Sequence, residues 1–248
     1  MSNRLQEQRF EIKFRVHEFK AQEIRQFVRN YLAIDPFGAT QPDLSYPLHS
    51  LYIDSQSMKT YQDTINGNRN RYKLRLRFYE NGDDAPIYFE IKRRFDKVIA
   101  KKRAKVHRRY VWDLLNGSMP IMKHLVHQTP KELEALEHFC FLMNQIHARP
   151  KIHVAYRREA YELEESNAVR VTFDREVRTK QESNYILNTN MDHSTTVFGN
   201  QVILELKFTD RFPDWFRELT QRYHLRQDSA AKYVDGIQIL ESSKLVLG

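Results

Sequence analysis

The sequence predicts an α+β fold built on an antiparallel sheet. Stretches in which apolar and polar residues alternate recur about eight times, and such alternation is typical of strands with one buried face. Several of these strands follow one another directly, which favours antiparallel neighbours over a parallel sheet in which strands and helices take turns. No internal repeat and no linker rich in Pro, Gly or Ser divides the 248 residues, so we expect one domain, residues 1–248.

The first half of the chain is expected to be mainly strands. Residues 9–17, RFEIKFRVH, alternate strictly and predict the first strand. Apolar residues at mixed three- and four-residue spacing predict a helix over 18–33, which the turn-forming sequence DPFG at 35–38 closes. Alternation and polar loops predict further strands at 48–54, 71–80, 86–95 and 98–112.

The second half mixes helices and strands. The pair LeuLeu at 114–115 and an apolar stripe over 131–148 predict helices, and Pro150 ends the second. Strands are expected at 150–164, 168–178 and 201–209, and helices at about 212–223 and 229–241. The polar run at 181–200 is expected to be a long connection.

The net charge indicates an anionic partner. Lys and Arg total 40 against 32 Asp and Glu, which gives +8 and suits nucleic acid, an acidic membrane or phosphates. No segment approaches the roughly 20 apolar residues of a membrane helix. The N-terminal sequence also lacks the apolar stretch of a signal peptide, so we expect a cytoplasmic protein without direct membrane insertion. The single Cys140 is expected to be a buried apolar residue.

The cations lie on predicted strands at a period of two residues. In YKLRLRFY, one face carries Lys73, Arg75 and Arg77, and the opposite face is apolar. A solvated sheet face is the usual meaning of such alternation. Here, however, the polar face is mostly Arg and Lys, which repel one another, so we expect an anion to neutralise them. If the sheet closes, the cations line an interior in which a phosphate chain supplies the missing negative charge.

The presence and absence of other motifs indicate how the chain could bind phosphates and metal ions. The chain has seven glycines and neither GxxxxGK[ST] nor GxGxxG, so phosphates would be held by Arg and Lys side chains. Carboxylates on the same faces are candidate ligands of Mg²⁺ or Mn²⁺, with salt bridges to neighbouring cations as the alternative: Glu11, Glu90, Asp174 and Glu205. No zinc spacing is present, and no nucleic-acid partner is expected because RNP1 and helix-turn-helix signals are missing.

A colinear series of short motifs runs through nearly the whole chain: FEIKFRV, SLYIDS, KLRLR, FEIK, AKKRAKV, AYRREAY, VRVTFD, LELKF and AAKYVDGI. In this order the sequence resembles the VTC domain, the polyphosphate polymerase domain of vacuolar transporter chaperone complexes, in the triphosphate tunnel metalloenzyme superfamily. The family commonly has Ser-Lys-Tyr or Ser-Lys-Phe near the C-terminus, where this chain has Ala231 before Lys232.

The resemblance implies a closed antiparallel β-barrel of about eight strands, a tunnel with helices packed outside, whose basic lumen binds ATP and polyphosphate. It implies Mn²⁺ or Mg²⁺ as cofactor, with Glu205 as a metal ligand and Tyr156 near the nucleotide base. The implied catalytic phosphate contacts are Lys13, Arg75, Arg77, Lys92, Arg158 and Arg170, and further phosphate-binding residues are Lys101, Arg103, Lys207 and Lys232.

The activity implied by the resemblance is transfer of the ATP γ-phosphate to a growing polyphosphate chain. Two alternatives stay open: a metal-dependent triphosphatase on the same fold, with metal-bound water as nucleophile, and a non-catalytic module that binds polyphosphate or other anions. The expected partners are ATP and polyphosphate, and a membrane-protein partner that carries the product away is left open.

Overall fold

The computed structural model describes residues 9–96, 98–163, 166–209 and 211–247. The first half contains β1 (Arg9–His17), α1 (Glu18–Val28), β2 (Ala33–Ile34), α2 (Pro36–Ala39), β3 (Ser45–Asp54), α3 (Lys59–Ile65), β4 (Asn70–Phe78), β5 (Ile87–Phe95) and β6 (Val98–Val106). After two short 3₁₀ helices, η1 (Arg108–Tyr110) and η2 (Met122–His124), and α4 (Val111–Leu115) between them, the second half contains α5 (Pro130–Gln145), β7 (Arg149–Leu163), β8 (Ser166–Gln181), β9 (Thr195–Thr196), β10 (Gln201–Thr209), α6 (Asp214–Arg222) and α7 (Lys232–Leu247).

All these strands join one antiparallel sheet, which confirms the predicted α+β class. The order is β2-β7-β3-β4-β5-β6-β1-β10-β8-β9. Strand β8 also pairs with β7, from Ile152↔Gln181 to Leu163↔Ser166. Strand β7 therefore has β3 as one neighbour and β8 as another, and the pairings lead from β3 through β4, β5, β6, β1 and β10 to β8. The weakest junction is that of β1 and β6, which share the single pair Arg9↔Ile99.

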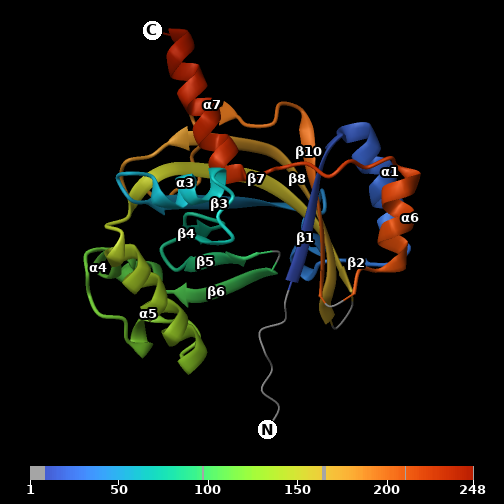
Figure 1. Cartoon of the computed structure of the whole chain (residues 1–248). Helices are drawn as coiled ribbons and strands as arrows, with labels where there is room; N and C mark the ends of the chain where they lie inside the picture. The colour runs from blue at the N-terminus through green and yellow to red at the C-terminus, as the bar shows by residue number, and fades with distance from the viewer. Residues whose placement is uncertain (1–8, 97, 164–165, 210, 248) are drawn as a thin grey trace.

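Helices pack against the strands (Figure 1), and clusters of buried apolar side chains lie between them. Helix α5 packs on β5 and β6, where the rings of Phe89 and Phe139 meet at 4.9 Å. Helices α1 and α6 cover β1 and β10 around the buried Phe216, and α7 lies against β7 and β8. Because alternate strand residues point to opposite faces, the charged rows point away from α1, α5 and α6. Helix α7 lies on the charged side, where its Lys232 contacts Asp174 and Glu205.

Several element boundaries differ from the sequence-based expectation. The strand expected at 98–112 ends at Val106, and the helix expected at 18–33 ends at Val28. Helix α3 was not expected. Its first turn is capped by the Asp54 carboxylate, which accepts hydrogen bonds from the backbone N–H of Thr60 at 2.9 Å and of Tyr61 at 3.0 Å. Because this cap comes from the end of a strand several residues earlier, local periodicity does not reveal the helix.

Two further expectations can be compared with the structure. Cys140 is buried, as expected. Within the described ranges, no helix combines the length and apolar character needed to cross a membrane.

Candidate functional site

The charged residues of different strands share one face of the sheet. Directly opposite residues of paired strands lie on the same face. Lys13 of β1 is opposite Glu205 of β10, and Arg75 of β4 is opposite Glu90 of β5. The same alternation runs through β6, β7 and β8, so a single inner face carries all the charged rows.

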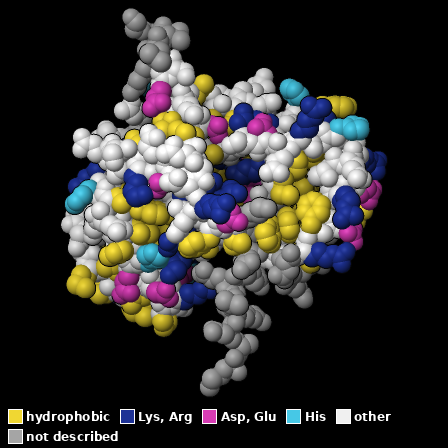
Figure 2. Space-filling model, viewed as in Figure 1, with side chains coloured by type: hydrophobic (Ala, Val, Ile, Leu, Met, Phe, Trp, Pro, Cys, Tyr) yellow, Lys and Arg dark blue, Asp and Glu magenta, His cyan; other side chains and the backbone are white. Residues whose placement is uncertain are grey.

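Side chains on this inner face also reach past a neighbouring strand. Lys92 of β5 donates to Glu11 of β1 at 3.1 Å although β6 lies between them, and Arg77 of β4 donates to the Tyr156 hydroxyl of β7 at 3.1 Å although β3 lies between them. Strands two places apart in a flat sheet are separated by about 10 Å. Together with the β7–β8 pairing, these contacts place the charged side chains on the concave side of a curled sheet. Figure 2 shows Lys and Arg side chains gathered with a few acidic ones in a hollow near the centre of the view.

Glu90 is the centre of the first charged cluster. Its carboxylate is completely buried, and the cation-to-oxygen distances are 2.7 Å for Arg75, 2.7 Å for Lys101, 3.2 Å for Arg103 and 3.9 Å for Arg77. Burial alone would raise the pKa of Glu90, but these four cations hold it well below its ordinary value. One negative charge therefore faces four positive ones.

Glu205 is the centre of the second cluster. Its oxygens lie 2.6 Å from Lys207, 3.1 Å from Lys232, 3.2 Å from Lys13 and 3.5 Å from Arg158. Burial opposes ionisation of Glu205, yet the surrounding cations, Lys13 first, keep its pKa well below the ordinary value. Burial also lowers the pKa of Lys207, to about 8, although Glu205 opposes this.

Asp174 of β8 orients two of these cations. Its oxygens accept hydrogen bonds from Arg158 Nε at 2.6 Å and Nη2 at 2.7 Å, a bidentate pair, and Lys232 Nζ lies 2.6 Å away. Lys232 is placed by the first turn of α7. The next residue, Tyr233, donates its hydroxyl to Asp54 at 2.7 Å, which anchors this turn to the end of β3.

Close packing of α7 keeps this turn in place. A Cβ atom added at Gly236 would lie 3.0 Å from Ile152 Cδ1 and 3.2 Å from Thr179 Oγ1. The absence of a side chain at Gly236 thus lets α7 approach β7 and β8 closely enough for Lys232 to reach the two carboxylates.

Lys73 is a cation of the inner face without a carboxylate partner. Among the described residues, no carboxylate oxygen lies within ion-pair distance of its Nζ, which is 5.6 Å from the centre of the Tyr233 ring. Its register partner is another cation, Lys92. Burial first, and then the charges of Lys92 and Lys13, lower the pKa of Lys73 to about 7. The inner face therefore contains more positive charge than its carboxylates balance.

Most of the residues singled out in the sequence come together on this face. Arg170 is the exception: it lies at the end of its row in a separate ion-pair group with Glu162 and Asp35, the latter at 2.7 Å. The ring of Tyr156 lies 4.8 Å from Lys232, and its hydroxyl accepts from Arg77, so the side chain joins the two clusters.

Sequence reasoning did not assign a site role to Lys73, although the alternation that places Arg75 on the inner face places Lys73 there too. It also missed the support that Asp54 and Tyr233 give to Lys232, because that contact joins residues far apart in the chain.

The carboxylates of the second cluster alternate with ammonium groups. Lys13 Nζ lies 3.2 Å from both Glu11 and Glu205, and Lys232 bridges Glu205 and Asp174. In the part of the chain that the structure describes, no three His, Cys, Asp or Glu residues are grouped as ligands for a metal. Mg²⁺ and Mn²⁺ are often held by one or two carboxylates, with substrate phosphate and water completing the coordination. Glu205 and Glu11 fit that kind of shared site, and they do not form an all-protein cage.

Comparisons with known proteins concern the family and the fold of the chain. The VTC domain matches residues 8–241 of the chain. None of the curated proteins matches the sequence. A candidate adenylate cyclase of Bacillus halodurans has a similar structure, with a TM-score of 0.50 at 12% identity over 90% of this chain and 94% of its own, a likeness of fold alone. A Pyrococcus horikoshii protein aligns with a TM-score of 0.48 at 11% identity over 94% of this chain and 99% of its own.

Proposed function

The chain belongs to the VTC domain family, a triphosphate tunnel fold, and on that premise we propose that it is a polyphosphate polymerase, which transfers the γ-phosphate of ATP to a growing polyphosphate chain. The observation that carries the proposal is the surplus of cations on the concave face, with four of them around the single carboxylate of Glu90. A linear anion rich in phosphate groups supplies the negative charge that this face lacks.

The proposal includes closure of the sheet into a tunnel. In support, the pairings lead from β7 through β3, β4, β5, β6, β1, β10 and β8 back to β7. The contact of Lys92 with Glu11 adds a side-chain link across β6, beside the sparse β1–β6 junction. An interior of this kind raises the strength of each charge contact, because water is largely excluded from it.

Phosphoryl transfer asks the protein mainly for positioning and charge stabilisation. Asp174 fixes the plane of the Arg158 guanidinium, and Glu90 does the same for Arg75, so both groups are oriented before a phosphate arrives. When phosphate oxygens bind, they form ion pairs with cations that are paired with the carboxylates in the ligand-free protein. Lys73 gains a stable proton at that moment, since a bound anion raises its pKa.

A divalent ion fits this scheme as a shared ligand of protein and substrate. Glu205, with Glu11 beside it, would hold the ion together with phosphate oxygens, and the ion would supply further neutralisation of the transferring group. Tyr156 is placed in the proposal beside the nucleotide base. Arg170 lies at the end of the inner-face residues of β8, so it would contact phosphate only at that end.

The experiment that tests the proposal is incubation of the protein with ATP and Mn²⁺, with analysis of both products. A polymerase yields ADP together with an acid-stable phosphate polymer that lengthens with time. A triphosphatase yields ADP and free phosphate in equal amounts, and a binding module yields neither while still retaining polyphosphate. Either of the latter two outcomes contradicts the polymerase.

The matched control is a pair of neighbouring arginines on β7. Arg158 points to the inner face, whereas Arg157 binds Asp43 at 2.6 Å and Ser45 on the other side of the strand. Arg158→Ala should abolish turnover and Arg157→Ala should keep it, although both remove one positive charge. Equal activities of the two variants would contradict a catalytic role of the inner face.

A further inference from the structure

A group of aromatic rings lies at the end of the inner face where β3 begins and β4 ends. It consists of Phe37 of α2, Tyr46 of β3, Tyr79 directly after β4 and Tyr88 of β5, and we call these four residues the aromatic rim. The ring centres are 4.8 Å apart for Phe37 and Tyr46, 6.5 Å for Tyr46 and Tyr79, and 5.6 Å for Tyr79 and Tyr88. Tyr88 is the register partner of Arg77, so the rim continues the inner face beyond its charged residues.

Arg103 joins the aromatic rim to the first charged cluster. Its guanidinium carbon lies 3.7 Å from the centre of the Tyr88 ring, and its Nη2 donates to the Tyr79 hydroxyl at 3.4 Å. On the other side, Arg103 Nε lies 3.2 Å from a carboxylate oxygen of Glu90. A ligand that contacts both the rim and the Glu90 cluster therefore needs a flat ring at one end and anionic groups at the other.

The charges beside the aromatic rim are balanced, unlike those of the Glu90 cluster. Arg170 donates to Glu162 and, at 2.7 Å, to Asp35, and its Nη2 lies 3.4 Å from the Tyr46 hydroxyl. Here two carboxylates face one cation, whereas four cations face the single carboxylate of Glu90. Carboxylates repel phosphate oxygens. This end of the inner face therefore suits the uncharged part of a nucleotide better than a series of phosphates.

Phe37 leaves part of its ring open to solvent. The residue is 52% exposed although its ring contacts those of Tyr46 and Tyr79, which are buried and half-buried. At the other end of the inner face, Tyr52 and Tyr233 stack on each other at 4.8 Å and are only 7% and 2% exposed. An exposed ring beside more buried ones provides a surface on which a further flat ring can stack.

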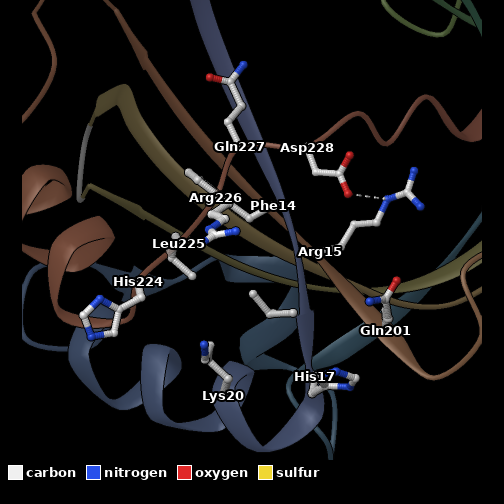
Figure 3. A pocket seen from close by; sticks show the side chains of 11 residues that line it. Phe14, Arg15, His17, Lys20, Gln201, His224, Leu225, Arg226, Gln227 and Asp228 are labelled. Atoms are coloured by element: carbon white, nitrogen blue, oxygen red, sulfur yellow. Dashed lines mark ion pairs between the residues drawn. The ribbon is translucent and has the colours of Figure 1, made fainter.

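A hollow of about 340 Å³ beside β1 is separate from the inner face. Figure 3 shows it between β1 and the segment from His224 to Asp228. Phe14, which belongs to its lining, lies on the apolar side of β1, opposite the side that carries Lys13. Arg15 at its edge is already paired with Asp228 at 3.2 Å, the contact drawn as a dashed line in Figure 3. This hollow therefore does not extend the site that a ligand of the inner face occupies.

We propose that the aromatic rim binds the base of the nucleotide, which stacks on Phe37, while the phosphates extend past Arg103 to the cluster around Glu90. The inference rests on the proposed function, because it assigns the orientation of ATP in that reaction. Tyr156 is buried, and Lys232 lies 4.8 Å from the centre of its ring. It therefore lines the nucleotide from the inner side, and the stacking contact is made by Phe37.

The test compares a ligand that has a base with one that has none. Equilibrium binding of ATP and of tripolyphosphate is measured at one ionic strength for the unchanged protein, for Phe37→Ala and for the matched control Phe141→Ala. The control removes an equally large ring, 62% exposed, from α5. We expect Phe37→Ala to bind ATP about tenfold more weakly, because the stacking contact is lost, and to keep its affinity for tripolyphosphate. The control should keep both affinities.

A second measurement reports on the stacking itself. Phe37→Trp places an indole ring where the base is expected, so ATP should quench the added fluorescence and tripolyphosphate should not. The matched variant Phe141→Trp should show no such difference between the two ligands. Equal responses of the two Trp variants to ATP would contradict stacking on the aromatic rim.

Three binding results would overturn the base site: an ATP affinity that Phe37→Ala leaves unchanged, losses of equal size for ATP and tripolyphosphate, or a protein that binds tripolyphosphate and no ATP. Failure of the proposed function gives a different result. If ATP binding depends on Phe37 but no polymer forms, the polymerase is refuted and the base site stands. If polymer forms while ATP binding does not depend on Phe37, the polymerase stands and the base site is refuted.

Discussion

Replacing Lys73 by Met is expected to stabilise the ligand-free protein at neutral pH. The ammonium group lies on the inner face opposite Lys92 and has no carboxylate partner among the described residues. Met keeps most of the length of the side chain and removes the charge. It therefore removes both the cost of burying an ammonium group and the repulsion from neighbouring cations.

The magnitude follows from the pKa of Lys73, which falls from 10.5 to about 7. A tenfold change in a protonation equilibrium corresponds to about 1.4 kcal/mol, so the complete cost of a charged Lys73 comes to about 5 kcal/mol. Because the side chain is only half-buried, water screens part of this cost, and we expect a gain of about 2 kcal/mol for the Met variant.

The sign of the pH dependence is also fixed. Between pH 7 and 10.5 the unfolded chain binds a proton at Lys73 that the folded chain releases, so the free energy of unfolding of the unchanged protein rises with pH. The advantage of Lys73→Met should therefore be full below about pH 7 and disappear towards pH 10.5.

The assay is urea unfolding at a series of pH values, with Lys73→Arg as the matched control. Arg keeps its charge throughout this range, so this variant should lose the pH dependence without the gain. A Met variant that is less stable than the unchanged protein at pH 7, or an advantage that does not change with pH, would refute the reasoning.

Three further predictions concern the inner face. The double variant Arg75→Ala/Arg77→Ala should lose nucleotide turnover. Its circular dichroism should show an intact fold, since neither side chain belongs to the apolar clusters. Wild-type turnover in the folded variant would falsify the role of these two arginines. Glu205→Gln should remove the response of activity to added Mn²⁺ while tripolyphosphate binding persists, because the amide keeps the shape and leaves the four surrounding cations in place; an unchanged metal requirement would assign the ion to another carboxylate. Gly236→Val should push α7 away from Ile152, move Lys232 and lower turnover at least tenfold with a cost of about 2 kcal/mol in stability; an activity equal to that of the unchanged protein would show that the position of α7 is not critical.

The strands and their charged faces were open to prediction because their evidence is local. Alternation in KLRLR places Arg75 and Arg77 on one face of a strand whatever the rest of the chain does, and β4 confirms the strand. The burial of Cys140 was predictable from its residue type alone, because an unpaired cysteine usually behaves as a small buried apolar residue.

Features that depend on contacts between distant segments were not open to prediction. Helix α3 is capped by Asp54 from the preceding strand, and the same carboxylate anchors Tyr233 of α7. Alternation also could not show that Arg170 would be held by Asp35 at the end of its row, or that Lys73 would lack a carboxylate. Each of these outcomes depends on which strands become neighbours.

The most direct test of the central claim is a crystal structure of the protein with tripolyphosphate. We expect the phosphate oxygens on the concave face, within about 3 Å of Arg75 on one side and Arg158 on the other. The contacts of these arginines with Glu90 and Asp174, now 2.7 Å and 2.6 Å, should lengthen as the anion takes over part of their charge. Tripolyphosphate bound only on the outer surface, with both ion pairs unchanged, would contradict the account.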